Sequence, residues 1–298
     1  VIYYPNMELW FWVAVGGAVV SGISNFFFKV AAKNECNAEL YILYSSLTSM
    51  VITTTLLIVW PQQLFGFGWI AFVVFIAGMT SALAGSLKVY ALRYIDSTLY
   101  FPLFKLIVPA LAICIGVTFF EESFTTIEWI GLIVGLLVPL MLINRSENSR
   151  QENLKMGLLL ILITGILSTI TAVTSKYAIV AEVPVNTTLL LTVLGISLGA
   201  FSLIVRKNGI RKIPVLIRKE TTNLLVKIAV LRSTFIVAGV WAMLYAYSLG
   251  GTLSVVQTIH SMYILIPIIL AIIFYNEHWN LQKAAAIILS VVSLVFLG

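Results

Sequence analysis

Ionisable side chains occur inside the long apolar segments of this sequence, and every one of them is basic: Lys29, Lys88, Lys105, Lys176, Lys227, Arg232 and His260. The 12 acidic residues all fall at or beyond the ends of those segments. A charge at the centre of a membrane helix costs about 2.5 to 3.5 kcal/mol, so each cation needs a compensating partner. Because the segments offer no acidic partner, the chemistry that fits is the binding of a carboxylate or phosphate ligand.

Depth within the segments separates these cations into two groups. Lys105 and Arg232 are each about eight residues from a segment end, roughly 12 Å along a helix, where contact with headgroups is difficult. We expect both to line a cavity and to hold the anionic group of a substrate. The other four lysines lie within about two turns of an end, where anchoring at the membrane surface is the simpler interpretation. Lys88 nevertheless remains a candidate binding residue.

Four further side chains are candidates for the same site. A lone histidine such as His260 is usually a satisfied core residue, but a shift of 155 positions places it opposite Lys105. Two basic side chains related by an internal repeat would converge near the middle of the membrane. Tyr90 and Tyr245, which share that shift, could supply cavity hydroxyls or interfacial anchors. Trp241 could stack on a substrate or simply pack.

Ten apolar segments must position these residues. The chain is 60% hydrophobic and 10% charged over 298 residues, which is typical of membrane proteins. Segments of about twenty residues can cross a hydrocarbon core of roughly 30 Å as helices, and their continuity argues against the alternating strands of a barrel. We therefore expect an all-α integral membrane protein with ten transmembrane helices, near residues 8–31, 38–60, 66–92, 98–118, 126–144, 155–180, 186–205, 224–249, 253–273 and 281–298.

The segments form two related blocks. A shift of 155 aligns residues near corresponding segment ends: Tyr90 and Ala91 with Tyr245 and Ala246, Phe119 with Phe274, and Glu122 with Glu277. A shift of 147 aligns Ser21 and Lys29 with Ser168 and Lys176 in the opening helices. The polar stretch from Arg145 to Glu152 separates the blocks, so we predict five-helix repeats over residues 1–148 and 149–298. Because five is odd, the second repeat would be inverted relative to the first.

The last helix of each block contains small residues spaced by four. Gly131 and Gly135 in the first block correspond to Ala286 and Ser290 in the second. Small residues at this spacing let membrane helices approach closely. We therefore expect close packing of helices 5 and 10, whose small-residue faces could also mediate a homodimer.

In one stretch of the first block, Tyr90 and Ala91 close one helix, Ser97 and Thr98 open the next, Pro109 lies within it, and Glu122 follows thirteen residues later. This stretch resembles the EamA-type transporters of the drug/metabolite transporter superfamily. The second block departs from this pattern, because Pro267 lies only ten residues before Glu277. Neither block has the Gly-Glu-Arg usual at the helix end. The resemblance implies the ten-helix inverted-repeat fold and a transport function.

Motifs for other functions do not occur in the sequence. It has no glycine-rich nucleotide loop and no His-Glu-x-x-His spacing, so we expect neither an enzyme nor a bound cofactor or metal. Its two cysteines are too few for a disulfide framework. The net charge of +6 resides mainly in loops beside apolar segments, which indicates contact with the lipid bilayer rather than with nucleic acid.

The hypothesis that accounts for these features is a secondary transporter, a facilitator or exchanger, in the plasma (inner) membrane. Its central cavity would bind a small anionic or zwitterionic metabolite. An amino-acid or related metabolite exporter of the same fold is the first alternative, and a membrane-embedded enzyme or lipid-handling protein is the second. Because the basic loops follow segments 1, 3, 5, 7 and 9, the positive-inside rule predicts that both termini are outside.

Overall fold

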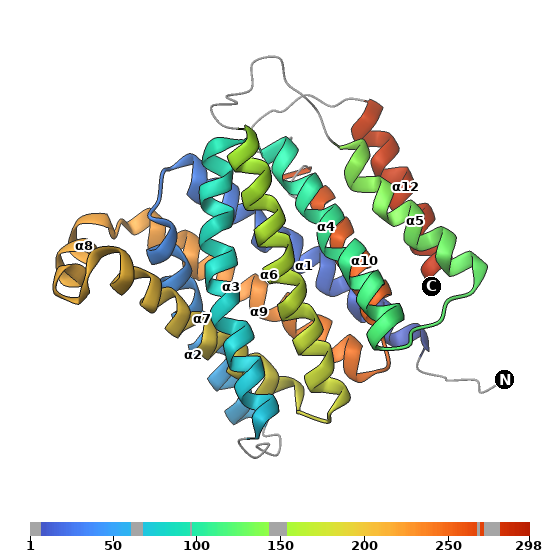
Figure 1. Cartoon of the computed structure of the whole chain (residues 1–298), viewed down its shortest axis with the longest axis horizontal. Helices are drawn as coiled ribbons and strands as arrows, with labels where there is room; N and C mark the ends of the chain where they lie inside the picture. The colour runs from blue at the N-terminus through green and yellow to red at the C-terminus, as the bar shows by residue number, and fades with distance from the viewer. Residues whose placement is uncertain (1–6, 61–67, 96, 143–153, 267–268, 271–280) are drawn as a thin grey trace.

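The computed structural model describes residues 7–60, 68–95, 97–142, 154–266, 269–270 and 281–298, and these residues form helices and no strand (Figure 1). The α-helices are α1 (Met7–Lys33), α2 (Ala38–Val59), α3 (Trp69–Tyr94), α4 (Ser97–Phe119), α5 (Thr126–Met141), α6 (Leu154–Val180), α7 (Val185–Asn208), α8 (Ile213–Glu220), α9 (Asn223–Ser248), α10 (Leu253–Ser261) and α12 (Leu281–Leu297). Within the described residues, seven helices are long and apolar enough to cross a membrane: α1, α2, α3, α4, α6, α7 and α9.

Apolar side chains on the outside of the bundle confirm the membrane class. On α6, Leu158, Leu162, Ile166 and Ile170 recur every fourth residue and are all exposed, with exposed fractions between 40% and 47%. Residues spaced by four share one face of a helix. A continuous apolar face of this length is stable against lipid and not against water. The chain is therefore a multi-pass membrane protein.

Polar residues at the predicted segment boundaries begin several helices. The Asn37 side chain accepts a hydrogen bond from the Leu40 amide and caps α2, and Thr222 caps α9 in the same way. Thr125 and Glu128 form a reciprocal capping box at the start of α5. Such caps satisfy backbone amides that have no partner within the helix. The helix bounds consequently lie close to the predicted ones.

Two segments differ from the prediction. The polar stretch between the segments predicted at residues 186–205 and 224–249 contains a 3₁₀ turn, Ile210–Lys212, followed by α8. The ninth segment was predicted to be one continuous helix, but α10 ends at Ser261 and a 3₁₀ turn, Met262–Ile264, follows. Propensity and hydropathy do not reveal a change from α to 3₁₀ geometry, because the same apolar residues suit both.

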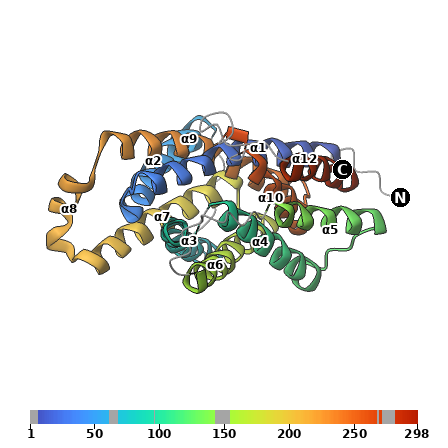
Figure 2. The ribbon, with the colours of Figure 1, turned by 90° about the horizontal axis from the view of Figure 1, so that it is seen from above.

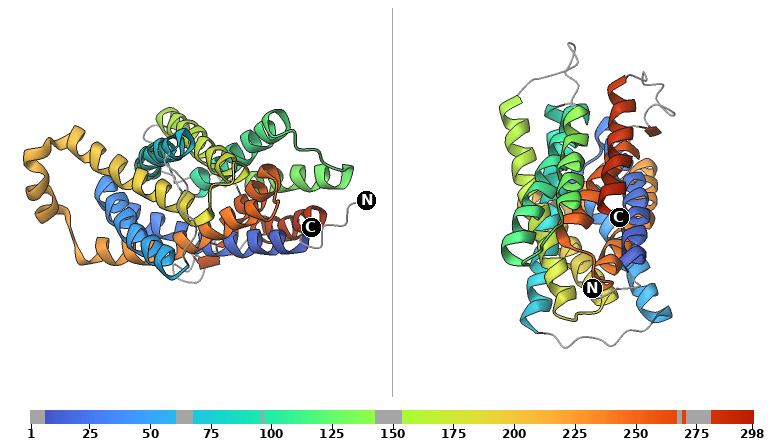
Figure 3. Two further views of the ribbon diagram at one scale, coloured as in Figure 1. Left: turned by 90° about the horizontal axis from the view of Figure 1, so that it is seen from below. Right: turned by 90° about the vertical axis from the view of Figure 1, so that its right-hand side faces the viewer.

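Corresponding helices of the two blocks have the same kinds of neighbours. α1 packs against α9, and α6 packs against α3; α4 packs against α6, and α10 packs against α1. α2 packs against α7, and α5 packs against α12 (Figures 1 and 3). Seen from above, α8 lies at one end of the elongated molecule, and the α5 and α12 pair lies at the other (Figure 2).

The backbone after the end of α1 resembles the backbone after the end of α6. α1 and α6 both end in a residue with a left-handed backbone, Glu35 at φ 51° and Glu182 at φ 62°, which are 147 positions apart. The amide of the next residue then bonds to a carbonyl five positions back, from Cys36 to Ala31 and from Val183 to Ala178.

The small-residue faces of the fifth and tenth predicted segments, which are α5 and α12, meet within one chain. The Ser293 hydroxyl of α12 donates a 2.7 Å hydrogen bond to the Gly131 carbonyl oxygen of α5, and Gly135 packs against the same serine. Ala286 and Ser290 are both buried. The expected close packing is confirmed, while a homodimer through these helices stays a prediction.

Several sequence predictions lie outside the described residues. They concern the break from Arg145 to Glu152, Pro267, Phe274 and Glu277.

Candidate functional site

A cavity of about 250 Å³ lies between the two blocks and contains four of the predicted site residues. These are Lys88 on α3, Lys105 on α4, Arg232 on α9 and His260 on α10. α1, α6 and α7 supply further lining residues, including Asn25, Ser168 and Thr192. No aspartate or glutamate is among the described residues that line this space. We call it the central cavity.

Lys105 is almost completely buried, with an exposed fraction of 5%. Its ammonium nitrogen lies 3.4 Å from the backbone carbonyl oxygen of His260 and 3.6 Å from the ring centroid of Tyr263. An ammonium over an aromatic face gains about 2 kcal/mol when it is desolvated. These neutral contacts leave donor capacity on a group that has three N–H bonds.

The side chain of His260 contacts α1. Its Nε2 lies 3.0 Å from the Ser21 hydroxyl oxygen. One turn further along α1, Asn25 donates a 2.8 Å hydrogen bond to the Ser21 carbonyl oxygen and accepts a 3.1 Å hydrogen bond from the Lys88 ammonium. A continuous polar chain therefore connects Lys88 of α3 to His260 of α10 through α1.

Arg232 extends from α9 towards α2, where it donates a hydrogen bond to the Ser45 hydroxyl. The Phe28 ring contacts both this guanidinium and Lys88, with its centroid 4.4 Å from Arg232 Cζ and 4.5 Å from Lys88 Nζ. The Nε atom of Arg232 is buried and has no hydrogen-bond partner. A buried donor without a partner is costly, which makes this atom a favourable contact for a ligand oxygen.

Together these contacts give the central cavity a strong preference for negative charge. Among the described residues, the partners of Lys88, Lys105 and Arg232 are a carbonyl, an amide, a hydroxyl and aromatic faces. A buried cation without an anionic partner costs several kcal/mol. An oxyanion in the cavity would recover part of that cost and would find free N–H donors on more than one helix.

The other predicted site residues lie elsewhere. The Tyr90 hydroxyl donates a 2.5 Å hydrogen bond to Glu39 and accepts one of 2.5 Å from Lys207, so it joins α2, α3 and α7. Trp241 stacks on Tyr245 with their ring centroids 5.0 Å apart, and neither lines the central cavity. The periodicity of the sequence does not indicate whether the helix faces that carry Tyr90, Tyr245 and Trp241 are turned towards the cavity.

The lysines expected to anchor at the membrane surface have different environments. Lys227 is exposed near the start of α9, as an anchor should be. Lys88 and Lys176 are buried, and Lys176 donates a 2.6 Å hydrogen bond to the Gly251 carbonyl oxygen. The anchoring interpretation is therefore wrong for these two lysines. Packing against neighbouring helices buries them although they lie close to a helix end in sequence.

A second, more polar cavity of about 490 Å³ lies near the end of α6. Lys176, Glu182, Tyr245 and Tyr247 are among its lining residues. Tyr247 accepts a 2.8 Å hydrogen bond from Gln257, which itself lines the central cavity. These two side chains therefore stand between the two cavities.

Sequence reasoning missed the aromatic rings that surround the cations. Phe28, Phe104 and Tyr263 contribute ring faces, and Asn25 bridges two helices. An aromatic residue in an apolar segment gives the same sequence signal whether it packs or faces a cation. Asn25 did carry a usable signal, because it lies one helical turn from Ser21 on the same face of α1.

Comparison with known proteins supports the fold and gives no further information. No family model and no curated protein match this sequence. Twenty-nine chains of solved structures match the model. One of them, described as “Crystal structure of protein”, superposes with a TM-score of 0.71 over 99% of this chain and 96% of that chain, at 12% sequence identity. At this identity the similarity concerns the fold alone.

Proposed function

We propose that this protein is a secondary transporter of the EamA type that moves a small anionic or zwitterionic metabolite through the central cavity. One observation carries the proposal: Lys88, Lys105 and Arg232 line one buried cavity whose described residues include no carboxylate. A transporter needs a polar site that a substrate can complete and then leave. Cations compensated only by neutral groups meet that requirement, since an anion stabilises them and water can replace it.

The architecture that we propose for this function is ten membrane spans in two inverted halves. The neighbours of α1, α4 and α9 correspond to those of α6, α10 and α3 when the halves are exchanged. The left-handed residues Glu35 and Glu182, which follow α1 and α6 at a spacing of 147 positions, also favour an internal repeat. In many transporters, rocking of two such halves about a central site exposes that site to each side alternately.

We also propose a plasma-membrane location, with the basic loops in the cytoplasm as the positive-inside rule predicts. Arg211 and Lys212 lie in the 3₁₀ turn before α8, Arg218 and Lys219 lie in its last turn, and all four would then face the cytoplasmic headgroups. This orientation places both termini outside.

The two alternatives make different demands on the cavity. An amino-acid exporter needs an acceptor for the substrate ammonium, and the described lining residues offer amide and hydroxyl oxygens but no carboxylate. A membrane enzyme needs a nucleophile and a base. Ser21 and His260 have a suitable distance of 3.0 Å, yet no carboxylate hydrogen-bonds to the imidazole among the described residues.

Counterflow in proteoliposomes tests the proposal. Vesicles that contain the purified protein are loaded with an unlabelled mixture of carboxylates and phosphate esters, and entry of each labelled compound is followed. We expect saturable, protein-dependent accumulation of at least one anion, with unchanged chemical identity inside the vesicle. Absence of exchange for every anion and amino acid, or conversion of the compound into a product, would refute the transporter assignment.

A further inference from the structure

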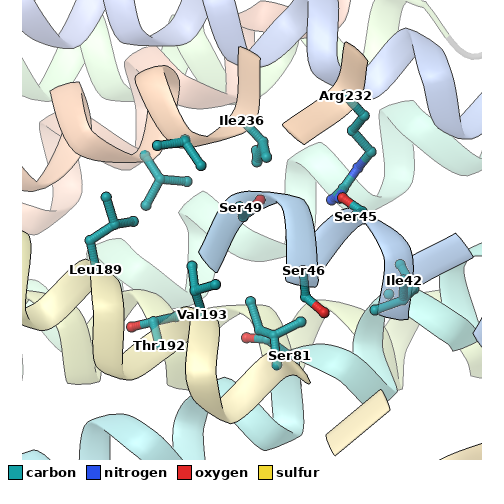
Figure 4. A pocket seen from close by; sticks show the side chains of 14 residues that line it. Ile42, Ser45, Ser46, Ser49, Ser81, Leu189, Thr192, Val193, Arg232 and Ile236 are labelled. Carbon is teal, nitrogen blue, oxygen red and sulfur yellow. The ribbon is translucent and has the colours of Figure 1, made fainter. Parts of the chain in front are cut away.

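A narrow side chamber of about 160 Å³ adjoins the central cavity, and we call it the apolar arm. The two spaces share Ser81, Gly85, Arg232 and Val240 among their lining residues. Figure 4 shows Arg232 at one end of the arm, extending from α9 to Ser45, while Leu189 and Val193 of α7 line its other part. The arm therefore leads away from a cation into a region lined by aliphatic side chains.

The hydroxyl groups of the arm are largely satisfied by the protein itself. Ser46 donates to the Leu43 carbonyl oxygen at 2.9 Å, and Thr192 donates to the Thr188 carbonyl oxygen at 2.8 Å. Ser81 is hydrogen-bonded to Thr171 at 2.6 Å. The remaining surface consists mainly of Ile, Leu and Val side chains. A sugar or other polyhydroxyl group would lose its hydration here and find few donors.

The size of the arm suits a compact apolar group. An engineered protein cavity of about 150 Å³ lined by Leu, Ile and Phe stays dry and binds benzene. The arm has nearly the same volume, and seven of its 14 lining residues are Ile, Leu or Val, although four serines and Thr192 also line it. It differs in having the Arg232 guanidinium at one end, where a carboxylate attached to the apolar group would lie.

We propose that the substrate is an organic carboxylate without an amino group that carries an apolar group of about the size of a phenyl ring. This inference rests on the proposed transport function and specifies its substrate class. The ring occupies the apolar arm, and the carboxylate lies among Arg232, Lys88 and Lys105. An amino group on the same molecule would add a fourth positive charge to a site that has no described carboxylate, so the cavity selects against amines.

Binding to the purified wild-type protein tests the substrate class with four matched probes. They are 3-phenylpropanoate, L-phenylalanine, 2-phenylethylamine and glycerol 3-phosphate, measured by competition and by thermal shift in detergent. We expect 3-phenylpropanoate to bind at least tenfold more tightly than each of the others. Equal or tighter binding of L-phenylalanine or of glycerol 3-phosphate would overturn the substrate class while leaving the transporter proposal intact.

Filling the arm provides an independent test. Val193 lines the arm but not the central cavity, so Val193→Phe should weaken 3-phenylpropanoate binding at least tenfold and leave the weaker binding of acetate unchanged. Val230→Phe is the matched control, because Val230 is 41% exposed on α9. Val193→Ala, which enlarges the arm, serves if the larger residue prevents folding, and should favour 3-(4-methylphenyl)propanoate over 3-phenylpropanoate.

The two proposals fail in distinguishable ways. Unchanged ring selectivity in both Val193 variants would refute the assignment of the arm, even if anions are still transported. If the wild-type protein binds no anion and shows no counterflow, the proposal that it is a transporter is refuted.

Discussion

The ammonium nitrogen of Lys105 lies 3.4 Å from the backbone carbonyl oxygen of His260, a residue 155 positions later in the chain. The sequence shift of 155 predicts matching positions for these two residues, and both line the central cavity. They meet through the backbone of His260 rather than its ring, because the imidazole turns to Ser21.

Replacing Lys105 by an apolar residue should stabilise the ligand-free protein. Lys105→Met removes a buried cation that no carboxylate balances and keeps much of the side-chain volume. Exchanging buried charge for apolar surface often stabilises a protein by about 1 to 4 kcal/mol. We expect the ligand-free variant to unfold at a higher temperature than the wild type in a detergent thermal assay. A lower unfolding temperature would show that Lys105 is structural.

Glu122 should contribute to stability and not to ligand binding. Its carboxylate accepts hydrogen bonds from the Leu253 and Ser254 amides and so caps the N-terminus of α10. Glu122→Gln replaces one acceptor oxygen by a donor that would face those amides, and we expect a loss of about 1 to 2 kcal/mol.

Glu121→Gln is the matched control, because Glu121 is exposed and makes no such contact. Denaturant or thermal unfolding distinguishes the two variants. Equal unfolding temperatures for both would contradict the capping role.

The contact between α3 and α7 should not tolerate a side chain at Gly78. A Cβ atom there would overlap the Thr192 backbone and lie 3.0 Å from the Cα atom of Gly195. Gly78→Val should therefore destabilise the protein by at least about 1 to 3 kcal/mol. In Gly16→Val, by contrast, the new Cβ meets no atom within 4 Å. Purification yield and unfolding temperature should fall for the first variant only.

Cys36 should react slowly with maleimides. Its thiol is buried with an exposed fraction of 8%, and burial raises the pKa of Cys36, although Arg93 opposes the shift. The thiolate is the reactive form, so a raised pKa lowers the reactive fraction at pH 7 to 8 and the rate should rise more steeply above pH 9. Labelling as fast as that of a free thiol would contradict this environment.

Because Cys36 is buried, membrane orientation is better measured with an exposed cysteine. Lys212→Cys places a thiol on the exposed segment beside α8, in the C36A and C114A background. If the basic loops are cytoplasmic, an impermeant maleimide should label this residue in inverted vesicles and not in intact cells. The opposite pattern would place both termini in the cytoplasm.

The sequence predicts the membrane class and most helix bounds well, because a continuous run of about twenty apolar residues is typical of a transmembrane helix. It also predicts that Lys105, Arg232 and His260 line one cavity, because a cation deep in a membrane helix is unfavourable without a polar partner. All three line the central cavity. It does not reveal α8, whose eight residues are too short and too polar to stand out from a loop.

Orientation within a helix is harder to predict. Tyr90 and Trp241 looked like cavity residues, but their helices are apolar on every side, so the hydrophobic pattern does not indicate which face is turned inward. The bridging role of Asn25 and the ring faces of Phe28 and Tyr263 depend on contacts between helices distant in the sequence. Only the assembled bundle reveals them.

The most direct test of the central claim is anion binding by the Lys105→Ala variant. Affinity for 3-phenylpropanoate and for acetate is measured beside Lys227→Ala, a lysine exposed near the start of α9, and Tyr90→Phe, which alters a residue outside the central cavity. The account predicts that Lys105→Ala weakens both anions by about 2 to 5 kcal/mol while the two controls bind as the wild type does. Wild-type affinity in Lys105→Ala, in a variant that remains folded, would contradict the account.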